Sequence, residues 1–145
     1  MHLFTELPSC NVKLDEEKKL IFLNDEYLRW CDNVLEVTLS DGEFETTINK
    51  NILLYLTTER LMIFYELNGY MTVYGIPIGW MNDTRSFIVG NNLLINLNVR
   101  FKTRSQELIF YKLLLKEIKD FKSKNNYETD KNILQHVHYY NFKKG

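Results

Sequence analysis

The chain has 145 residues, of which 45% are hydrophobic and 14% are aromatic, a composition that suits one globular domain with a real core. Its formal net charge is −1 and it contains two cysteines, so neither bulk charge nor a disulfide framework defines the protein. The charge is unevenly distributed. Residues 1–99 contain 7 Lys and Arg against 14 Asp and Glu, whereas residues 100–145 contain 11 Lys and Arg against 5 Asp and Glu. A basic C-terminal third of this kind suits either a polyanionic partner or a solvated helix face.

The opening residues, MHLFTELPSC, lack the basic and apolar regions of a secretory signal. No apolar run in the sequence approaches the roughly 18 residues that a membrane span requires. We therefore expect a cytoplasmic protein whose two cysteines, Cys10 and Cys31, remain reduced.

The first predicted element is a β-hairpin over residues 34–48, VLEVTLSDGEFETTI. Leu35, Val37 and Leu39 alternate with polar residues, as expected of a strand with one buried face. The Asp-Gly pair that follows predicts the turn, because glycine accepts the positive φ that tight hairpin turns require.

Two β-rich runs follow, Ile52–Leu56 and Leu61–Tyr65, joined by the polar tetrad TTER. A further strand over residues 70–76 comes after an Asn-Gly turn signal, and residues 87–101 contain another turn and then strict alternation of apolar and polar residues. About six short strands with turn signals between them predict a small antiparallel sandwich or barrel.

The hydrophobic period becomes that of a helix over residues 105–123, SQELIFYKLLLKEIKDFKS. At 100° per residue, the apolar side chains expected to face the core cover an arc of about 160°, made up of Leu108, Phe110, Tyr111, Leu114, Leu115, Ile118 and Phe121. We expect Leu108, Leu115 and Ile118 in particular to be buried. Ile109 and Leu113 fall outside this arc among lysines, so we expect a partner or the C-terminal tail to cover them.

Residues 53–65, LLYLTTERLMIFY, resemble the signature G-x-x-Y-L-T-x-x-R-x-I-F of GRAM domains, which belong to the pleckstrin-homology (PH) superfold. Residues 32–41, DNVLEVTLSD, and residues 74–99 are similar to segments of the GRAM domains in WW-domain-binding proteins. The resemblance covers about residues 20–122. It implies a mainly β fold, a PH-like sandwich or barrel of GRAM type, with one long C-terminal helix.

The chain departs from that family in two places. Ile52-Leu53 stand where the family has a glycine before the Tyr-Leu-Thr motif. The PPxY tail that engages WW domains is absent, since the sequence has two prolines, Pro8 and Pro77. WW-domain binding is therefore not expected of this chain.

We divide the chain into three parts on these grounds. Residues 20–123 are expected to form the PH/GRAM-like domain, preceded by an N-terminal extension over residues 1–19. Residues 124–145 form a basic and aromatic tail, in which residues 129–140 have the pattern of a short amphipathic helix.

The sequence predicts no catalytic residues, no metal site and no cofactor. His136 and His138 are spaced i, i+2, without a neighbouring Cys or carboxylate cluster at metal-ligand spacing, and we interpret them as surface residues of the tail. The glycines follow no phosphate-loop spacing. We therefore expect a protein that is not an enzyme.

A basic group lies where the last strand meets the helix. Arg100, Lys102 and Arg104 are spaced i, i+2, i+4 and are expected on one face of the strand. The tail adds side chains suited to stacking on bases and contacting phosphates, namely Tyr139, Tyr140, Phe142, Lys143 and Lys144. These residues are candidates for nucleic-acid binding, and the alternative is a charged edge strand that resists aggregation.

Binding of membrane lipid is not expected through the first hairpin. PH-like proteins commonly present Lys and Arg there to phosphoinositide phosphates, whereas the loop here, SDGEFE over residues 40–45, carries three carboxylates. These would repel a multiply charged headgroup.

The main functional hypothesis is a non-enzymatic adaptor that docks on a larger protein or ribonucleoprotein assembly through the helix flank and the C-terminal tail. The partner-binding candidates on the helix are Ile109, Leu113, Lys112, Lys116 and Lys119. One alternative is a ribosome- or RNA-associated factor that blocks or silences its target. A second alternative is a phosphoinositide membrane adaptor.

Overall fold

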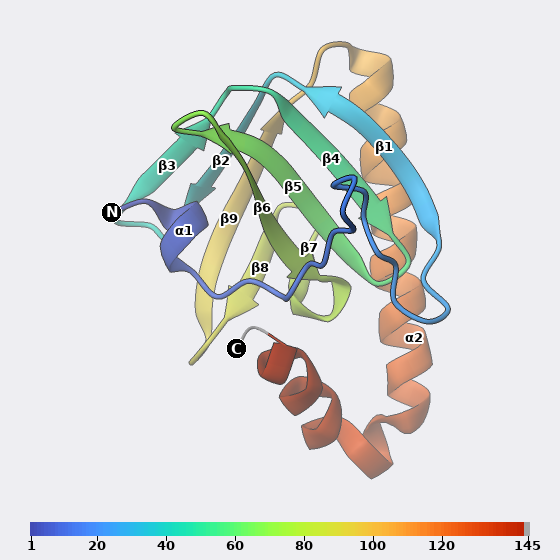
Figure 1. Ribbon diagram of the computed structural model, residues 1–145. Helices are drawn as coiled ribbons and strands as arrows, with labels where there is room; N and C mark the ends of the chain where they lie inside the picture. The colour runs from blue at the N-terminus through green and yellow to red at the C-terminus, as the bar shows by residue number, and fades with distance from the viewer. Residues whose placement is uncertain (144–145) are drawn as a thin grey trace.

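The computed structural model describes the backbone of residues 1–143 and the side chains of residues 1–124. Within this part, two antiparallel sheets pack face to face and a long helix lies beside them (Figure 1). The four-stranded sheet has the order β1 (Leu28–Val34), β4 (Ile52–Thr57), β5 (Arg60–Leu67), β6 (Tyr70–Pro77). The five-stranded sheet has the order β3 (Glu45–Ile48), β2 (Glu36–Ser40), β9 (Leu93–Arg100), β8 (Ser86–Val89), β7 (Met81–Asp83). The helical elements are α1 (Leu3–Glu6), the 3₁₀ turn η1 (Ile78–Trp80) and α2 (Arg104–Lys143).

The predicted fold class is confirmed: the chain is mainly β, with two sheets and one long C-terminal helix. The hairpins form where the turn residues predict them. Gly42 has φ +94°, and Asn68 and Gly69 have φ +52° and +83°, the left-handed conformations that two-residue hairpin turns require. The turn between β8 and β9 likewise places Gly90 at φ +55°.

The strand β1 differs from the prediction, which began the sheet at the β2–β3 hairpin. β1 pairs with β4, and the chain then crosses to the other sheet at Leu35, whose N–H donates to the carbonyl of Arg100 at 2.9 Å. Val34 and Val37 are both buried while Leu35 is exposed. The expected burial of Leu35 is therefore wrong, because the alternation of faces is interrupted where the chain leaves one sheet for the other.

The helix α2 closes the opening between the sheets and packs against β1, η1 and β7. Phe110, Leu114 and Ile118 are buried in the common core, which confirms the prediction for Ile118. Leu108 and Leu115 are 56% and 42% exposed, so the predicted burial of these two residues is wrong. The buried face is rotated by roughly 60° from the predicted one, at 100° per residue.

Two polar residues explain that rotation. Gln106 and Glu117 are buried on the core face of α2, and a prediction that counts only apolar side chains leaves both outside the buried stripe. Gln106 Nε2 donates to the carbonyl of Asn33 at 2.7 Å, and its Oε1 accepts from the N–H of Lys102 at 2.8 Å. Glu117 Oε2 lies 3.3 Å from Nε of Arg29 in β1. The two hydrogen bonds of Gln106 make burial of its amide tolerable.

The ends of α2 also differ from the prediction. The N-cap is Thr103, whose Oγ1 accepts from the N–H of Gln106 at 3.0 Å, so the start signal lies two residues before the predicted Ser105. At the other end, the backbone continues as helix past Ser123 to Lys143. The short helix expected over residues 129–140 is therefore part of α2.

The N-terminal residues pack against the sandwich. Leu3 and Phe4 of α1 belong to the core, although residues 1–19 were expected to be an extension outside the domain. Residues 8–27, which we call the strap, then cross the outer face of the four-stranded sheet in front of β6 and β5 (Figure 1). The contact is close, since a Cβ on Gly75 of β6 would lie 2.5 Å from Sγ of Cys10.

A buried ion pair fastens the strap to the sheet. Arg60, the first residue of β5, forms a bidentate pair with Glu26: Nε to Oε2 at 2.8 Å and Nη2 to Oε1 at 2.9 Å. Both side chains are almost completely buried. Two further N–H groups of Arg60 donate to strap carbonyls, those of Asn11 at 3.1 Å and Ile21 at 3.3 Å. Arg60 therefore contacts the strap at three places.

The pKa of Glu26 is lowered from its ordinary value of 4.5. Burial alone would raise it, but hydrogen bonds from Arg60, Thr57 and the Leu23 N–H, together with the charge of Arg60, outweigh the loss of solvation. A carboxyl with a lowered folded-state pKa contributes stability above its unfolded pKa and loses it as the pH falls toward the folded value. The contribution of Glu26 is thus present at neutral pH and is lost below about pH 4.5.

We predict that Ile118→Ala lowers the free energy of unfolding by on the order of 2–5 kcal/mol, because it truncates a core side chain. Leu115→Ala, on the exposed face of the same helix, is the matched control and should change stability by no more than about 0.5 kcal/mol. Urea denaturation followed by circular dichroism measures both. Equal losses for the two variants would contradict the orientation of α2.

We predict that Glu26→Gln costs on the order of 3–5 kcal/mol at pH 7, because it leaves the buried charge of Arg60 without its counter-ion. Glu36→Gln, which removes a partly exposed pair with Arg100, is the control and should cost at most about 1 kcal/mol. Stability measured between pH 7 and pH 3 should fall less in Glu26→Gln than in the wild type. Parallel pH curves would show that Glu26 is not the titrating group.

Candidate interaction surface on the C-terminal helix

The first part of α2 carries large apolar side chains on its solvent face. Leu108, Ile109 and Leu115 are 56%, 48% and 42% exposed. They are exposed because the opposite face of the helix is used by Phe110, Leu114 and Ile118, which pack into the core. Three exposed lysines lie on the same face. We call these six residues the α2 surface: Leu108, Ile109, Lys112, Leu115, Lys116 and Lys119.

The α2 surface differs in part from the predicted ridge of Ile109 and Leu113. Ile109 lies on the solvent face, as its place outside the predicted core arc implies, but Leu113 is half-buried and packs against the core. Leu108 and Leu115 take its place on the solvent face. A helix that buries Gln106 and Glu117 must turn Leu108 and Leu115 outward, and the sequence does not show by itself that these two polar residues are buried.

The charge of the α2 surface is basic. Lys116 pairs with Asp120, Nζ to Oδ2 at 2.7 Å, and both side chains are largely exposed. The hydrogen bond from Lys116 to Asp120 raises the pKa of the lysine, so it remains protonated at neutral pH. The acidic Glu117 does not offset this charge at the surface, because it is buried on the other side of the helix.

Glu117 is a carboxyl on the buried face of α2. Burial raises its pKa, and the charge of Arg29 only partly opposes that effect. Oε2 is close enough to Arg29 for an ion pair but has no hydrogen-bond partner. The side chain therefore contributes to the orientation of α2 without being fully compensated electrostatically.

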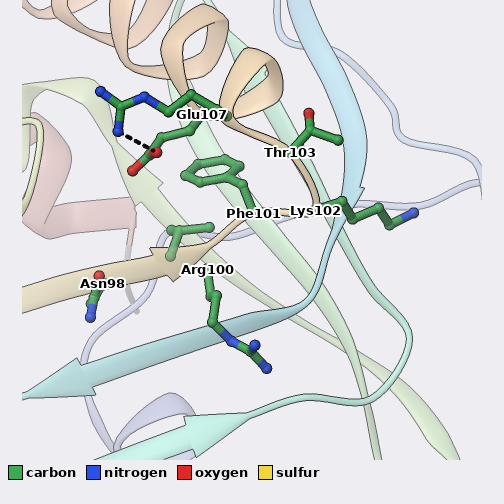
Figure 2. Close-up of a pocket in the computed structure, with 8 residues that line it drawn as sticks. Asn98, Arg100, Phe101, Lys102, Thr103 and Glu107 are labelled. Atoms are coloured by element: carbon green, nitrogen blue, oxygen red, sulfur yellow. Dashed lines mark hydrogen bonds and ion pairs between the residues drawn. The ribbon is translucent and has the colours of Figure 1, made fainter.

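The basic residues at the start of α2 line a groove with a volume of about 370 Å³. Its walls come from the end of β9, the connection over residues 101–103 and the first turn of α2 (Figure 2). The groove contains all three predicted residues, Arg100, Lys102 and Arg104. Their predicted placement on one face of a strand is wrong, because β9 ends at Arg100 and α2 begins at Arg104.

The charges in this groove do not converge. In Figure 2 the side chains of Arg100 and Lys102 extend in different directions, and neither points at the ring of Phe101. Arg100 pairs with Glu36 at 3.2 Å, and Arg104 pairs with Glu107 at 3.5 Å, the interaction drawn as a dashed line. Since two of its three cations already have carboxylate partners, the groove is poorly suited to a phosphate backbone.

The remaining nucleic-acid candidates are in the C-terminal segment. Tyr139, Tyr140, Phe142 and Lys143 lie outside the residues whose side chains the structure describes, and Lys144 lies outside the described backbone. Their proposed role therefore stays a prediction.

The first hairpin keeps its negative charge. Asp41 Oδ1 accepts hydrogen bonds from the N–H groups of Phe44 at 2.7 Å and Glu43 at 2.8 Å. These bonds lower the pKa of Asp41. Glu43 and Glu45 are exposed beside it, so a phosphoinositide headgroup would meet carboxylates at this loop.

The described residues include neither a metal-binding cluster nor a helix suited to spanning a membrane. Residues 1–124 bring together no group of three His, Cys, Asp or Glu side chains that could hold a metal ion. In that same part of the chain, no helix combines the length and the hydropathy needed to cross a membrane. Neither Cys10, which is buried, nor Cys31, which is exposed, forms a disulfide in this part of the chain.

Comparison with known proteins supports the fold. No family model matches the chain, and no curated protein matches it in sequence. A solved structure, the Vps36 N-terminal PH domain, superposes with a TM-score of 0.54 at 10% sequence identity and covers 77% of this chain and 93% of that one. The chain therefore has a PH-like fold. The narrower resemblance to GRAM domains of WW-domain-binding proteins is not confirmed.

We predict that the first hairpin confers no affinity for phosphoinositides. In a sedimentation assay with vesicles that contain mixed phosphoinositides, the protein should remain in the supernatant, because Asp41, Glu43 and Glu45 repel the headgroups. The variant with all three changed to Lys tests the reason and should pellet more than the wild type. Strong pelleting of the wild type that disappears on charge reversal within this loop would contradict the prediction.

Proposed function

We propose that this chain is a non-enzymatic interaction module that docks on a larger macromolecular assembly through the α2 surface and the C-terminal continuation of that helix. The observation that supports the proposal is the grouping of three exposed apolar side chains among lysines on one helix face. Single exposed apolar residues are normal on protein surfaces. Three on one face of a two-turn segment form a patch of the kind found at the centre of interfaces.

The energetics support a contact of this kind. Completely burying a Leu or Ile side chain contributes about 1.5–3 kcal/mol, so three such side chains provide a useful part of the free energy of association. The losses of translational freedom and of side-chain entropy offset part of this gain. The lysines on the same face would add selectivity and a faster association rate more than affinity.

The contacts of Phe121 and Lys122 bear on where the C-terminal tail begins. Phe121 is half-buried against the core, and Nζ of Lys122 donates to the carbonyl of Asn82 at 3.2 Å. Contacts with the body thus reach at least as far as this point of α2 within the residues whose side chains the structure describes. We propose that residues 124–145 act as a separate basic and aromatic tail that extends the docking site.

A second candidate function is a ribosome- or RNA-associated factor that silences its target. The single sign of charge on the α2 surface favours it, since lysines on one face are the electrostatic footprint of a polyanion site. The exposed leucines do not favour it, because a phosphate backbone offers them no apolar contact. Salt dependence separates the two, since each phosphate contact that the protein makes steepens the weakening of binding with salt.

We predict that the tagged protein captures a protein partner that is retained when the salt concentration is raised from about 0.1 M to 0.5 M, because an apolar contact is screened little. The bound protein and RNA are identified at both concentrations. Replacing Leu108, Ile109 and Leu115 by Ser should release the partner and leave the melting temperature nearly unchanged.

The control variant changes Tyr70 and Met71 to Ser at the tip of the β5–β6 hairpin, where both side chains are exposed. It should retain the partner. Recovery of RNA that is lost at high salt would support the silencing factor instead. Identical capture by the wild type and by the α2 variant would remove the basis of the proposed site.

A further inference from the structure

The α2 surface has a defined length and direction. Leu108 and Leu115 are seven residues apart, so they lie within about 20° of one line along the helix and are separated by about 10 Å of helical rise. Ile109 lies roughly 100° around the helix from Leu108. The apolar side chains therefore mark a strip about two turns long, which is the contact length of one short helix.

The charges along this strip have one sign. Lys112 and Lys119 lie beside the line of the two leucines, and neither forms an ion pair with a side chain of residues 1–124. The acidic residues of this part of α2 are used elsewhere: Glu107 pairs with Arg104, and Glu117 pairs with Arg29. Asp120 pairs with Lys116 at the edge of the strip. The complementary surface must therefore supply both carboxylates and apolar anchors.

Leucines and lysines lie side by side on the α2 surface, and this arrangement suits a protein helix better than a membrane or an RNA. At a membrane, leucines that insert would carry the neighbouring ammonium groups toward the apolar region, where the charge is costly unless the lysines bend outward. An RNA would satisfy the lysines but not the leucines. A protein helix can satisfy both, because apolar anchors at i, i+3, i+4 and i+7 alternate with carboxylates at fixed intervals.

We propose that the occupant of the α2 surface is an acidic amphipathic helix of a partner protein, packed lengthwise against Leu108 and Leu115 with its carboxylates facing Lys112, Lys116 and Lys119. This proposal rests on the proposed function, because it names the partner chemistry of the same site. It goes beyond that function because it specifies that the bound element is a helix, that its charge is negative and that it lies along the axis of α2.

The probe is a fluorescent 18-residue synthetic peptide with Leu at i, i+3, i+4 and i+7 positions and Glu elsewhere on the flanks. Fluorescence anisotropy should show saturable binding at 0.15 M salt, and helicity of the peptide should rise on binding. A peptide with Lys in place of every Glu should not bind. Amide resonances that shift on titration of ¹⁵N-labelled protein should be those of residues 105–120.

Two pairs of substitutions test the charged and the apolar contributions to peptide binding separately. Lys112→Glu with Lys119→Glu should weaken binding by about tenfold or more, and Leu108→Ser with Leu115→Ser should do the same. The matched control is Lys13→Glu with Lys18→Glu on the strap, which changes the net charge equally. It should alter the dissociation constant by less than about twofold, since exposed charges that are distant from the site are screened.

Failure of this inference can be told apart from failure of the proposed function. If the α2 surface is needed to capture a partner but the acidic peptide does not bind, the partner chemistry is wrong and the docking site stands. If phosphatidylserine vesicles or a single-stranded RNA bind through the same residues and the peptide does not, a lipid surface or RNA is the occupant and the inference is overturned. If neither capture nor peptide binding depends on the α2 surface, both proposals fail.

Discussion

The buried ion pair between Arg60 and Glu26 is the constraint on which much of this structure depends. An unpaired arginine at the start of a buried strand would be costly, so the chain must bring a carboxylate to it. That carboxylate comes from the strap, and with it come two strap carbonyls that accept further guanidinium hydrogens. The strap then crosses the outer face of β5 (Figure 1), where Met62 and Phe64 are buried although they point away from the core between the sheets. The ring of Phe64 also packs against that of Tyr55 on this face, with the centroids 5.2 Å apart.

Polar side chains that need buried partners also determine the packing at the other side of the sandwich, where α2 lies. Gln106 and Glu117 find their partners on β1 and on the connection before α2, and these contacts decide which way the helix faces. Once that orientation is fixed, Leu108 and Leu115 have no place in the core. The apolar residues that we propose as part of a docking site are thus turned outward by polar interactions beneath the helix.

The sequence predicts those parts of the fold that local rules determine. The Asp41-Gly42 and Asn68-Gly69 turns place the hairpins, and the change from a period of two to a period of 3.6 places the start of the helix. The Arg60–Glu26 pair spans 34 residues, and nothing local to either residue indicates the other. The face of α2 was mispredicted for the same reason, because the burial of Gln106 depends on a carbonyl 73 positions away. Four of the six residues of the α2 surface were consequently among the predicted candidates, whereas Leu108 and Leu115 were not.

The close approach of the strap to Gly75 has a practical consequence for dividing this protein into pieces. A fragment that begins at residue 20 keeps Glu26 but lacks Cys10, Asn11 and the apolar α1 residues Leu3 and Phe4. Gly75 would lose the chain that pairs with it through the Cys10 N–H, and its side of β6 would become an open strand edge next to newly uncovered apolar surface. Such edges template pairing between molecules. A soluble domain therefore has to include the first residues of the chain, and a loss of solubility on trimming them would reflect this exposed edge rather than an inherently unstable sandwich.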